Sequence, residues 1–95
     1  MKADIKFSIP VSIFREDKQF VVYTPALDLS TSGKSYEEAK KRFGQAVLIF
    51  FDEIIKKGTL EEVLSELGWR KIRKRWSPPV PIAQNFEEFT VPLPV

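Results

Sequence analysis

The residues best suited to chemistry form a basic cluster near the end of this 95-residue chain. Five of the six positions 70–75 are lysine or arginine, and Trp69 and Trp76 stand on either side. The basic residues are Arg70, Lys71, Arg73, Lys74 and Arg75. Clustered cations neutralise nucleic-acid phosphates, and an exposed indole stacks on an unpaired base. This segment is therefore the candidate nucleic-acid-binding site of the chain.

A simpler interpretation of the same segment is a solvated strand or turn whose two tryptophans belong to the core. Tryptophan is highly buried on average, and this interpretation is favoured over base stacking. The charge balance still sets the segment apart. Residues 1–69 hold 10 lysines and arginines against 11 aspartates and glutamates, whereas residues 76–95 contribute only Glu87 and Glu88. The net charge of +2 therefore comes from one local cluster.

Enzymatic chemistry has few candidate residues here. The sequence contains no histidine and no cysteine, which excludes serine–histidine triads, thiolate chemistry and histidine-rich zinc sites. The remaining candidates are the carboxylates of Asp4, Asp28, Glu37, Glu38, Asp52 and Glu53. Two-metal phosphoryl chemistry needs carboxylates to converge on ions about 4 Å apart, but a helical rise of about 1.5 Å per residue puts Asp52 roughly 20 Å from Glu37. We expect no catalytic residue, no metal site and no cofactor.

The element that organises the chain is a long helix predicted over Ser35–Lys57. Ser35 and Glu38 form a capping box, and Gly58 supplies a residue that ends a helix. Between these signals an apolar residue recurs every three or four positions, which produces one apolar stripe along a helix. The stripe consists of Tyr36, Ala39, Phe43, Ala46, Val47, Phe50 and Ile54.

Three further apolar residues, Leu48, Phe51 and Ile55, lie beside this stripe in helical geometry. The apolar surface of the second half of the helix is therefore too wide for one sheet to cover. Either the apolar residues of segment 60–64 cover the excess, which we favour, or a second subunit does. In the second case these three residues belong to an oligomer or partner interface.

Strands are predicted before the helix. Alternation of apolar and polar side chains is typical of a strand with one buried face, and Pro10 places the first strand at an edge or at a bulge. The predicted strands cover residues 5–14, 20–24 and 27–31, with a polar connection at 15–18 and a turn at 32–34.

The C-terminal third is predicted to be more extended. A second capping box, Thr59 with Glu62, opens a short helix through Leu67. Residues 69–76 then form an extended segment, and residues 77–81 form a polyproline-like arm. We therefore expect an α+β fold: a three- to four-stranded, mainly antiparallel sheet packed on one long helix in the order β-β-β-α, with a short second helix and an extended proline-rich tail.

The tail itself ends in a candidate strand over residues 86–91. Such a strand suits exchange with another protomer by strand addition, or docking on its own sheet. In the first case Phe86, Phe89 and Val91 are interface residues. Residues 1–69 then form the α/β domain, and residues 70–95 belong to the same domain or act as an oligomerisation arm.

The segment Tyr23–Gly33, followed by Ser35–Ala39 and Ala46, resembles the HicB family of antitoxin-like proteins. The resemblance covers roughly residues 5–57. It rests on the Pro-x-Leu-Asp pattern of residues 25–28, on the glycine before the helix cap, and on the Glu-Ala pair inside the helix. It implies a partial RNase H fold and a non-enzymatic, homo-oligomeric antitoxin that binds and neutralises a HicA-like, mRNA-cleaving toxin.

Two features depart from the family pattern. Many members carry a helix-turn-helix or ribbon–helix–helix that binds the promoter, and residues 59–95 contain neither, so standard operator binding is not expected. An RNA-binding toxin should itself be basic, and like charges repel. The toxin is therefore expected to contact the neutral body rather than residues 70–75, and nucleic-acid binding through those residues is the alternative function.

The location of the protein is expected to be cytoplasmic. Its first residues show no signal-peptide pattern, and no apolar run approaches the roughly 20 residues of a membrane span. The absence of cysteine suits a reducing compartment. We expect no association with a membrane.

Overall fold

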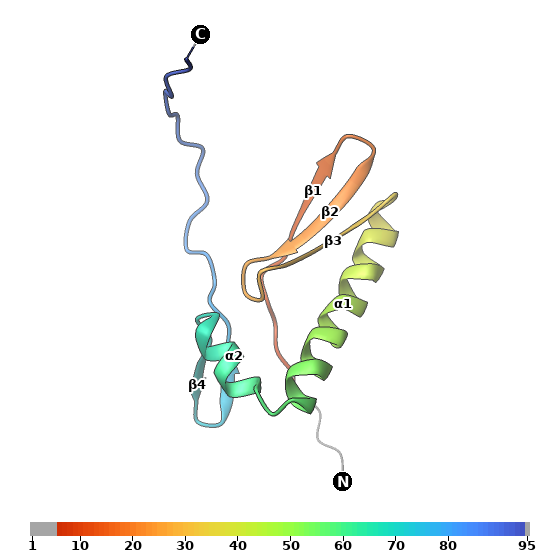
Figure 1. Cartoon of the computed structure of the whole chain (residues 1–95), viewed down its shortest axis with the longest axis vertical. Helices are drawn as coiled ribbons and strands as arrows, with labels where there is room; N and C mark the ends of the chain where they lie inside the picture. Colours follow the sequence, from red (N-terminus) through yellow and green to blue (C-terminus); the bar gives the residue numbers. More distant parts are fainter. Residues whose placement is uncertain (1–5, 95) are drawn as a thin grey trace.

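The computed structural model describes residues 6–94 and confirms the predicted α+β architecture. A three-stranded antiparallel sheet packs on one long helix, and a short helix, a small hairpin and an extended tail follow (Figure 1). The elements are β1 (Ser12–Glu16), β2 (Gln19–Thr24), β3 (Leu29–Gly33), α1 (Tyr36–Lys56), α2 (Leu60–Glu66), β4 (Arg70–Ile72) and β5 (Arg75–Ser77). In residues 6–94 no helix is both long and apolar enough to cross a membrane.

The three strands lie in the order β1-β2-β3, with each neighbour antiparallel. The first strand is shorter than predicted, since residues 6–11 lie outside any strand. Pro10 has no amide hydrogen to donate to a ladder, yet Phe7 and Ile9, which precede it, still pack against the core. The third strand runs on to Gly33, so most of the turn predicted at 32–34 is strand.

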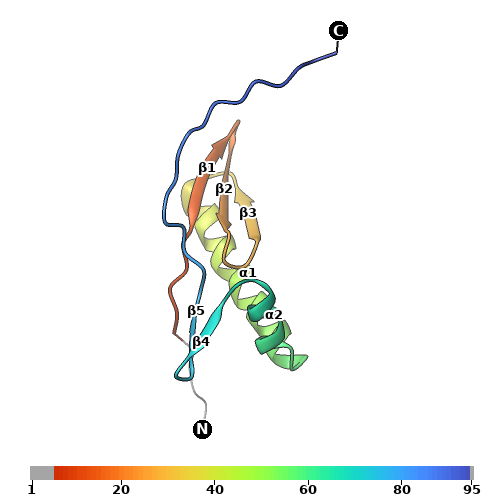
Figure 2. The ribbon, with the colours of Figure 1, turned by 90° about the vertical axis from the view of Figure 1, so that its left-hand side faces the viewer.

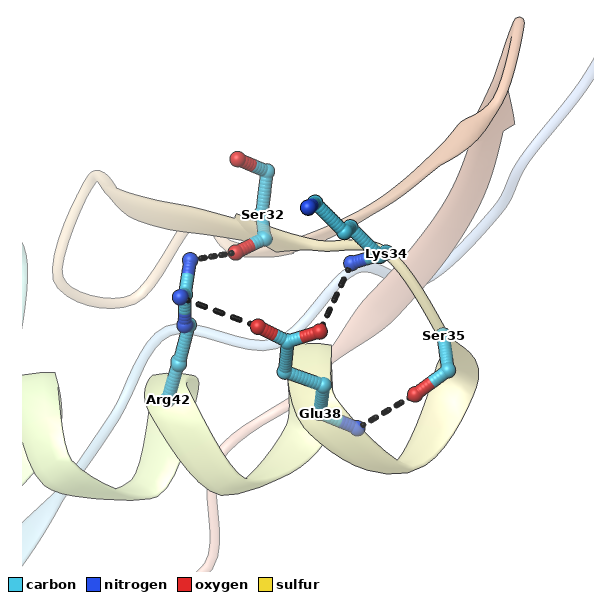
Figure 3. A network of polar contacts seen from close by, with 5 residues as sticks. All are labelled: Ser32, Lys34, Ser35, Glu38 and Arg42. Atoms are coloured by element: carbon cyan, nitrogen blue, oxygen red, sulfur yellow. Dashed lines mark hydrogen bonds and ion pairs between the residues drawn. The ribbon is translucent and has the colours of Figure 1, made fainter.

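The start of α1 is held by a polar network that joins it to β3 (Figure 3). Ser35 Oγ accepts a hydrogen bond from the Glu38 amide at 3.1 Å, as the capping box predicts. The Glu38 carboxylate reaches past the cap, accepting from the Lys34 amide at 3.1 Å and pairing with Arg42 at 2.9 Å. Arg42 also donates to the carbonyl oxygen of Ser32 at 3.3 Å. Strand and helix are therefore fixed to each other at this corner.

Gly33 explains how closely the two elements approach. A Cβ atom at this position would lie 2.6 Å from the Ala39 amide nitrogen and 2.9 Å from its Cα. Only a residue without a side chain allows the end of β3 to lie this near α1. The fully buried Ala39 forms the other side of the contact.

The core has two parts along α1. Near its start, Ala39 and Phe43 pack with Val22 of β2. Near its end, Phe51 and Ile54 form a cluster with Ala26, Leu27, Leu64 and Trp69. The favoured prediction, that segment 60–64 covers the second apolar face, holds only for Phe51, which is buried with Leu64, whereas Leu48 and Ile55 stay exposed. The prediction that Phe51 belongs to an interface is wrong, because α2 and Trp69 enclose it within the chain.

The turn between α1 and α2 differs from the predicted second capping box. Gly58 has a positive φ of 69°, as its helix-ending role requires. The Thr59 side chain makes no capping hydrogen bond to α2 and instead donates to the Ile54 carbonyl oxygen at 3.5 Å. The Thr59 hydroxyl, predicted to cap the start of α2, is thus bonded to the end of α1 instead.

Residues 70–77 form a two-stranded hairpin, not the single extended segment predicted. Lys71 lies opposite Trp76, and the two-residue turn consists of Arg73 and Lys74, both with positive φ (51° and 67°). Positive φ at both turn residues is the geometry of a type I′ hairpin.

The tail leaves the body after this hairpin and runs on as extended chain (Figures 1 and 2). Within the described part of the chain, residues 78–94 form no helix and no strand. The strand predicted over residues 86–91 is therefore wrong for the single chain, in which the segment pairs with neither edge of the β1-β2-β3 sheet. Docking of the tail on its own sheet is likewise not observed.

Candidate binding surfaces

Trp69 is a core residue. Its side chain is 4% exposed, and its indole nitrogen donates a hydrogen bond to the Ala26 carbonyl oxygen at 2.7 Å. Edge-to-face contacts with Phe7 and Phe51 fix the ring on two further sides. The prediction that Trp69 stacks on a nucleic-acid base is therefore wrong. Trp76 is half-buried and packs at the margin of the same cluster.

The loop between β2 and β3 holds this tryptophan through the Ala26 carbonyl oxygen. Thr24 is fully buried, and its hydroxyl oxygen accepts a hydrogen bond from the Ala26 amide at 3.2 Å. Ala26 and Leu27 enter the core, while Asp28 adopts a positive φ of 48°. The Pro-x-Leu-Asp segment is thus a shaped loop that presents one backbone carbonyl to the indole of Trp69.

The candidate carboxylates are dispersed. Glu37 and Glu38 lie at the start of α1, and Asp52 and Glu53 lie near its end. The Asp28 carboxylate accepts a hydrogen bond from the Tyr23 hydroxyl at 3.2 Å; partial burial and this carboxylate raise the pKa of Tyr23. Across residues 6–94 no group of three or more potential ligands is placed to hold a metal ion. Asp4 lies outside the described residues.

The hairpin displays the predicted basic cluster on its surface. Arg70, Arg73, Lys74 and Arg75 are all exposed. Lys71 is the one member that forms an ion pair among the residues described, through Nζ to Glu61 Oε1 on α2 at 2.7 Å. This contact lowers the pKa of Glu61 through the hydrogen bond and the charge of the lysine. Lys71 also lies 5.7 Å from the centre of the Trp76 ring.

An open hollow of about 920 Å³ lies beside this hairpin. Its lining consists of Lys6, Lys71, Lys74, Arg75, Trp76 and Ser77. Lys6 is 65 residues from Lys71 in the sequence and was not predicted as a site residue. No local pattern marks it, because only the packing of Phe7 against the core beside Trp69 brings it to the hairpin.

A second surface lies on the exposed side of α1. Leu48 is 72% exposed, Ile49 63% and Ile55 53%. The prediction that Leu48 and Ile55 are available for an interface agrees with this exposure, whereas Phe51 is buried. Ile49 was missed, because it follows neither the main stripe nor its flank.

The tail provides a third apolar surface. The predicted residues Phe86, Phe89 and Val91 are exposed, and so are Ile82 and Leu93. At the root of the tail, Pro79 lies close to Gly68, since a Cβ atom on the glycine would be 3.8 Å from the proline ring. The tail thus begins close to the body and displays large side chains beyond its root.

Comparison with known proteins gives no relative for this chain. No family model, no curated protein and no solved structure matches it. The function must therefore be argued from these three surfaces.

Proposed function

We propose that this protein is a non-enzymatic, cytoplasmic antitoxin of HicB type, which neutralises a small, basic, RNA-cleaving toxin by binding it through the C-terminal tail. One observation carries the proposal: a small domain with its own buried core is followed by an exposed tail that has large apolar side chains. Burying a phenylalanine side chain contributes roughly 1.5–3 kcal/mol. The two tail phenylalanines offer this free energy to a partner, because the fold of the single chain does not use it.

The composition of the tail supports a binding role over that of a solvated linker. Chain segments that stay disordered are poor in aromatic and β-branched residues, whereas Phe86, Phe89 and Val91 lie within six positions. The backbone there is outside any strand, so its amides and carbonyls are available for addition to the edge of a partner sheet. In such an addition the backbone supplies affinity and alternate side chains supply specificity.

Charge favours the tail over the hairpin as the contact for a toxin. Glu87 and Glu88 are the only charged residues after Arg75. Opposite charge accelerates association with a basic protein, and like charge opposes it. A toxin that binds RNA phosphates should approach the acidic tail and avoid the basic hairpin. The tail therefore replaces the neutral body as the proposed contact.

The rest of the fold would set the position of the tail. The HicB-like loop holds Trp69 through a hydrogen bond to Ala26, and Trp69 is the residue directly before the hairpin. After the hairpin, Pro79 lies near Gly68 where the tail begins. The resemblance to the HicB family covers only about residues 5–57. This is consistent with a scaffold shared with that family and a binding tail particular to this chain.

The exposed side of α1 is the proposed contact between copies of the protein. Leu48, Ile49 and Ile55 expose apolar surface on a rigid helix, and a two-fold pairing would bury this surface against itself. Sedimentation of the wild type and of the double variant Leu48→Lys/Ile55→Lys tests this. We expect the wild type to be dimeric and the variant monomeric with an unchanged circular dichroism spectrum. A wild-type monomer at high concentration would contradict the α1 interface.

The function is tested by co-expression with each adjacent reading frame, scoring growth and co-purification at high salt. We expect one small basic protein to arrest growth alone, and the wild-type chain to restore growth and retain it. The variant Phe86→Ser/Phe89→Ser/Val91→Ser should lose both effects. The matched control Arg70→Ser/Arg73→Ser/Lys74→Ser should keep them.

Three results would contradict the proposal. Rescue by the tail variant would remove the tail from the contact. Loss of rescue in the hairpin control would move the contact to the basic cluster. If no adjacent product is toxic and none is retained, the antitoxin function itself is wrong.

A further inference from the structure

We propose that the hollow beside the β4–β5 hairpin binds a single-stranded nucleic acid, with its phosphates on the cations and one base against Trp76. This site is separate from the tail and does not depend on the toxin proposal. Of the six described residues that line it, four are Lys6, Lys71, Lys74 and Arg75, and none is a carboxylate. Such a set of cations neutralises phosphates and releases their counterions.

The hollow brings together parts of the chain that are distant in sequence. Lys6 arrives from the segment before β1, and the other lining residues come from β4, the turn and β5. Lys71 is partly satisfied by Glu61, since that ion pair lies at 2.7 Å. Lys6, Lys74 and Arg75 form no ion pair within residues 6–94 and are exposed. These three are the cations most available to an incoming phosphate.

The hairpin turn gives independent support. Arg73 and Lys74 both hold positive φ angles, whereas a type I′ turn favours Asn-Gly because other residues clash in this region. The left-handed conformation is unfavourable for residues other than glycine, because their Cβ atom crowds the backbone. Strained backbone of this kind concentrates at binding sites. Here the strained turn places two cations at the tip of the hairpin, one of which lines the hollow.

The arrangement favours a single strand over a duplex. One side of the hairpin is engaged with the body, because Trp76 packs on the core cluster and Lys71 pairs with α2. The major groove of a duplex admits a two-stranded β-ribbon, but the side of this hairpin that packs on the body is not free to enter it. A half-buried tryptophan in a cationic hollow instead suits an unstacked base, which a single strand supplies.

The test uses fluorescence anisotropy of the full-length protein with a labelled single-stranded RNA, its single-stranded DNA counterpart and the matching DNA duplex. We expect both single strands to bind more tightly than the duplex, with affinity that falls steeply between about 50 and 200 mM salt. The variant Lys6→Ser/Lys74→Ser/Arg75→Ser should weaken binding at least tenfold. Its salt slope should decrease by about 2, because each phosphate contact on a single strand contributes about 0.7.

A matched control removes three charges elsewhere. Lys18, Lys41 and Lys57 are exposed lysines outside the hollow, so Lys18→Ser/Lys41→Ser/Lys57→Ser changes the net charge equally. We expect it to bind within about threefold of the wild type. Equal weakening in both variants would mean that total charge, not the hollow, drives binding. Duplex binding as tight as single-strand binding would overturn the assignment to a single strand.

Discussion

The body and the C-terminal quarter of this protein use their side chains in different ways. In the body, Trp69, Thr24 and Ala39 are buried and hold the loop, the sheet and the helix together. Beyond Trp69, the hairpin exposes five cations and the tail exposes two phenylalanines. The buried residues of the body therefore maintain the fold, whereas the surfaces suited to partners are the hairpin, the tail and the exposed side of α1.

The largest effect that separates the two regions is expected at the tryptophans. Trp69→Ala removes a buried ring and leaves the Ala26 carbonyl oxygen without its donor, so we expect a loss of about 3–5 kcal/mol in the free energy of unfolding. Trp76→Ala, at a half-buried position on the hairpin, should cost less than half as much. Urea unfolding followed by circular dichroism measures both. Equal losses in the two variants would contradict the claim that Trp69 belongs to the core and Trp76 only to its margin.

Two glycines of the body provide a matched pair with opposite signs. Gly33→Ala places a Cβ atom against the Ala39 backbone, and the shift this forces should cost about 1–3 kcal/mol. Nothing lies within 4 Å of a Cβ atom at Gly44 in the middle of α1. Gly44→Ala should therefore stabilise the protein by about 1 kcal/mol through helix propensity. A thermal unfolding midpoint of Gly33→Ala that stays the same or rises would refute the close contact at Gly33.

A smaller effect is expected at the helix start. Ser35→Ala removes the oxygen that accepts from the Glu38 amide, which should cost about 1 kcal/mol. Ser35→Asp keeps an acceptor at the same place and should retain most of the stability. If the alanine variant unfolds at the same urea concentration as the wild type, the cap contributes nothing.

The smallest effect concerns the ion pair that joins the hairpin to α2. Lys71 lowers the pKa of Glu61, so this contribution to stability is present above the unfolded pKa and is lost as pH falls through the lower folded pKa. In Lys71→Ser the Glu61 carboxyl should titrate at a higher pH. An NMR titration of the Glu61 side chain in both proteins measures the difference. An unchanged titration would mean that the pair does not persist in solution.

The sequence predicted the elements whose signals are local. Ser35, Glu38 and Gly58 bounded α1 correctly, because caps and helix-ending residues act over a few positions. The β-β-β-α order followed from alternation and turn chemistry. The capping signal failed at Thr59 because another local acceptor, the Ile54 carbonyl oxygen at the end of α1, was available to its hydroxyl.

The binding surfaces were harder to predict because they depend on distant contacts. The hairpin turn at Arg73 and Lys74 has neither asparagine nor glycine, so no turn signal marked it. Lys6 joins the hollow only through the folded core. Phe51 was assigned to an interface because its cover, Trp69, lies beyond the segment that helical periodicity describes. The sequence marked Phe86, Phe89 and Val91 as interface residues, which agrees with their exposure. It did not reveal that this segment pairs with no strand of its own chain.

The most direct test of the division between body and tail is hydrogen exchange of the full-length protein, alone and with the co-purified partner. The account predicts slow exchange for the amides of β2 in both states. Amides between Ile82 and Val91 should exchange without protection in the free protein and become protected in the complex. A tail protected in the free protein, or unprotected in the complex while the body changes, would contradict the claim that the tail is the binding arm.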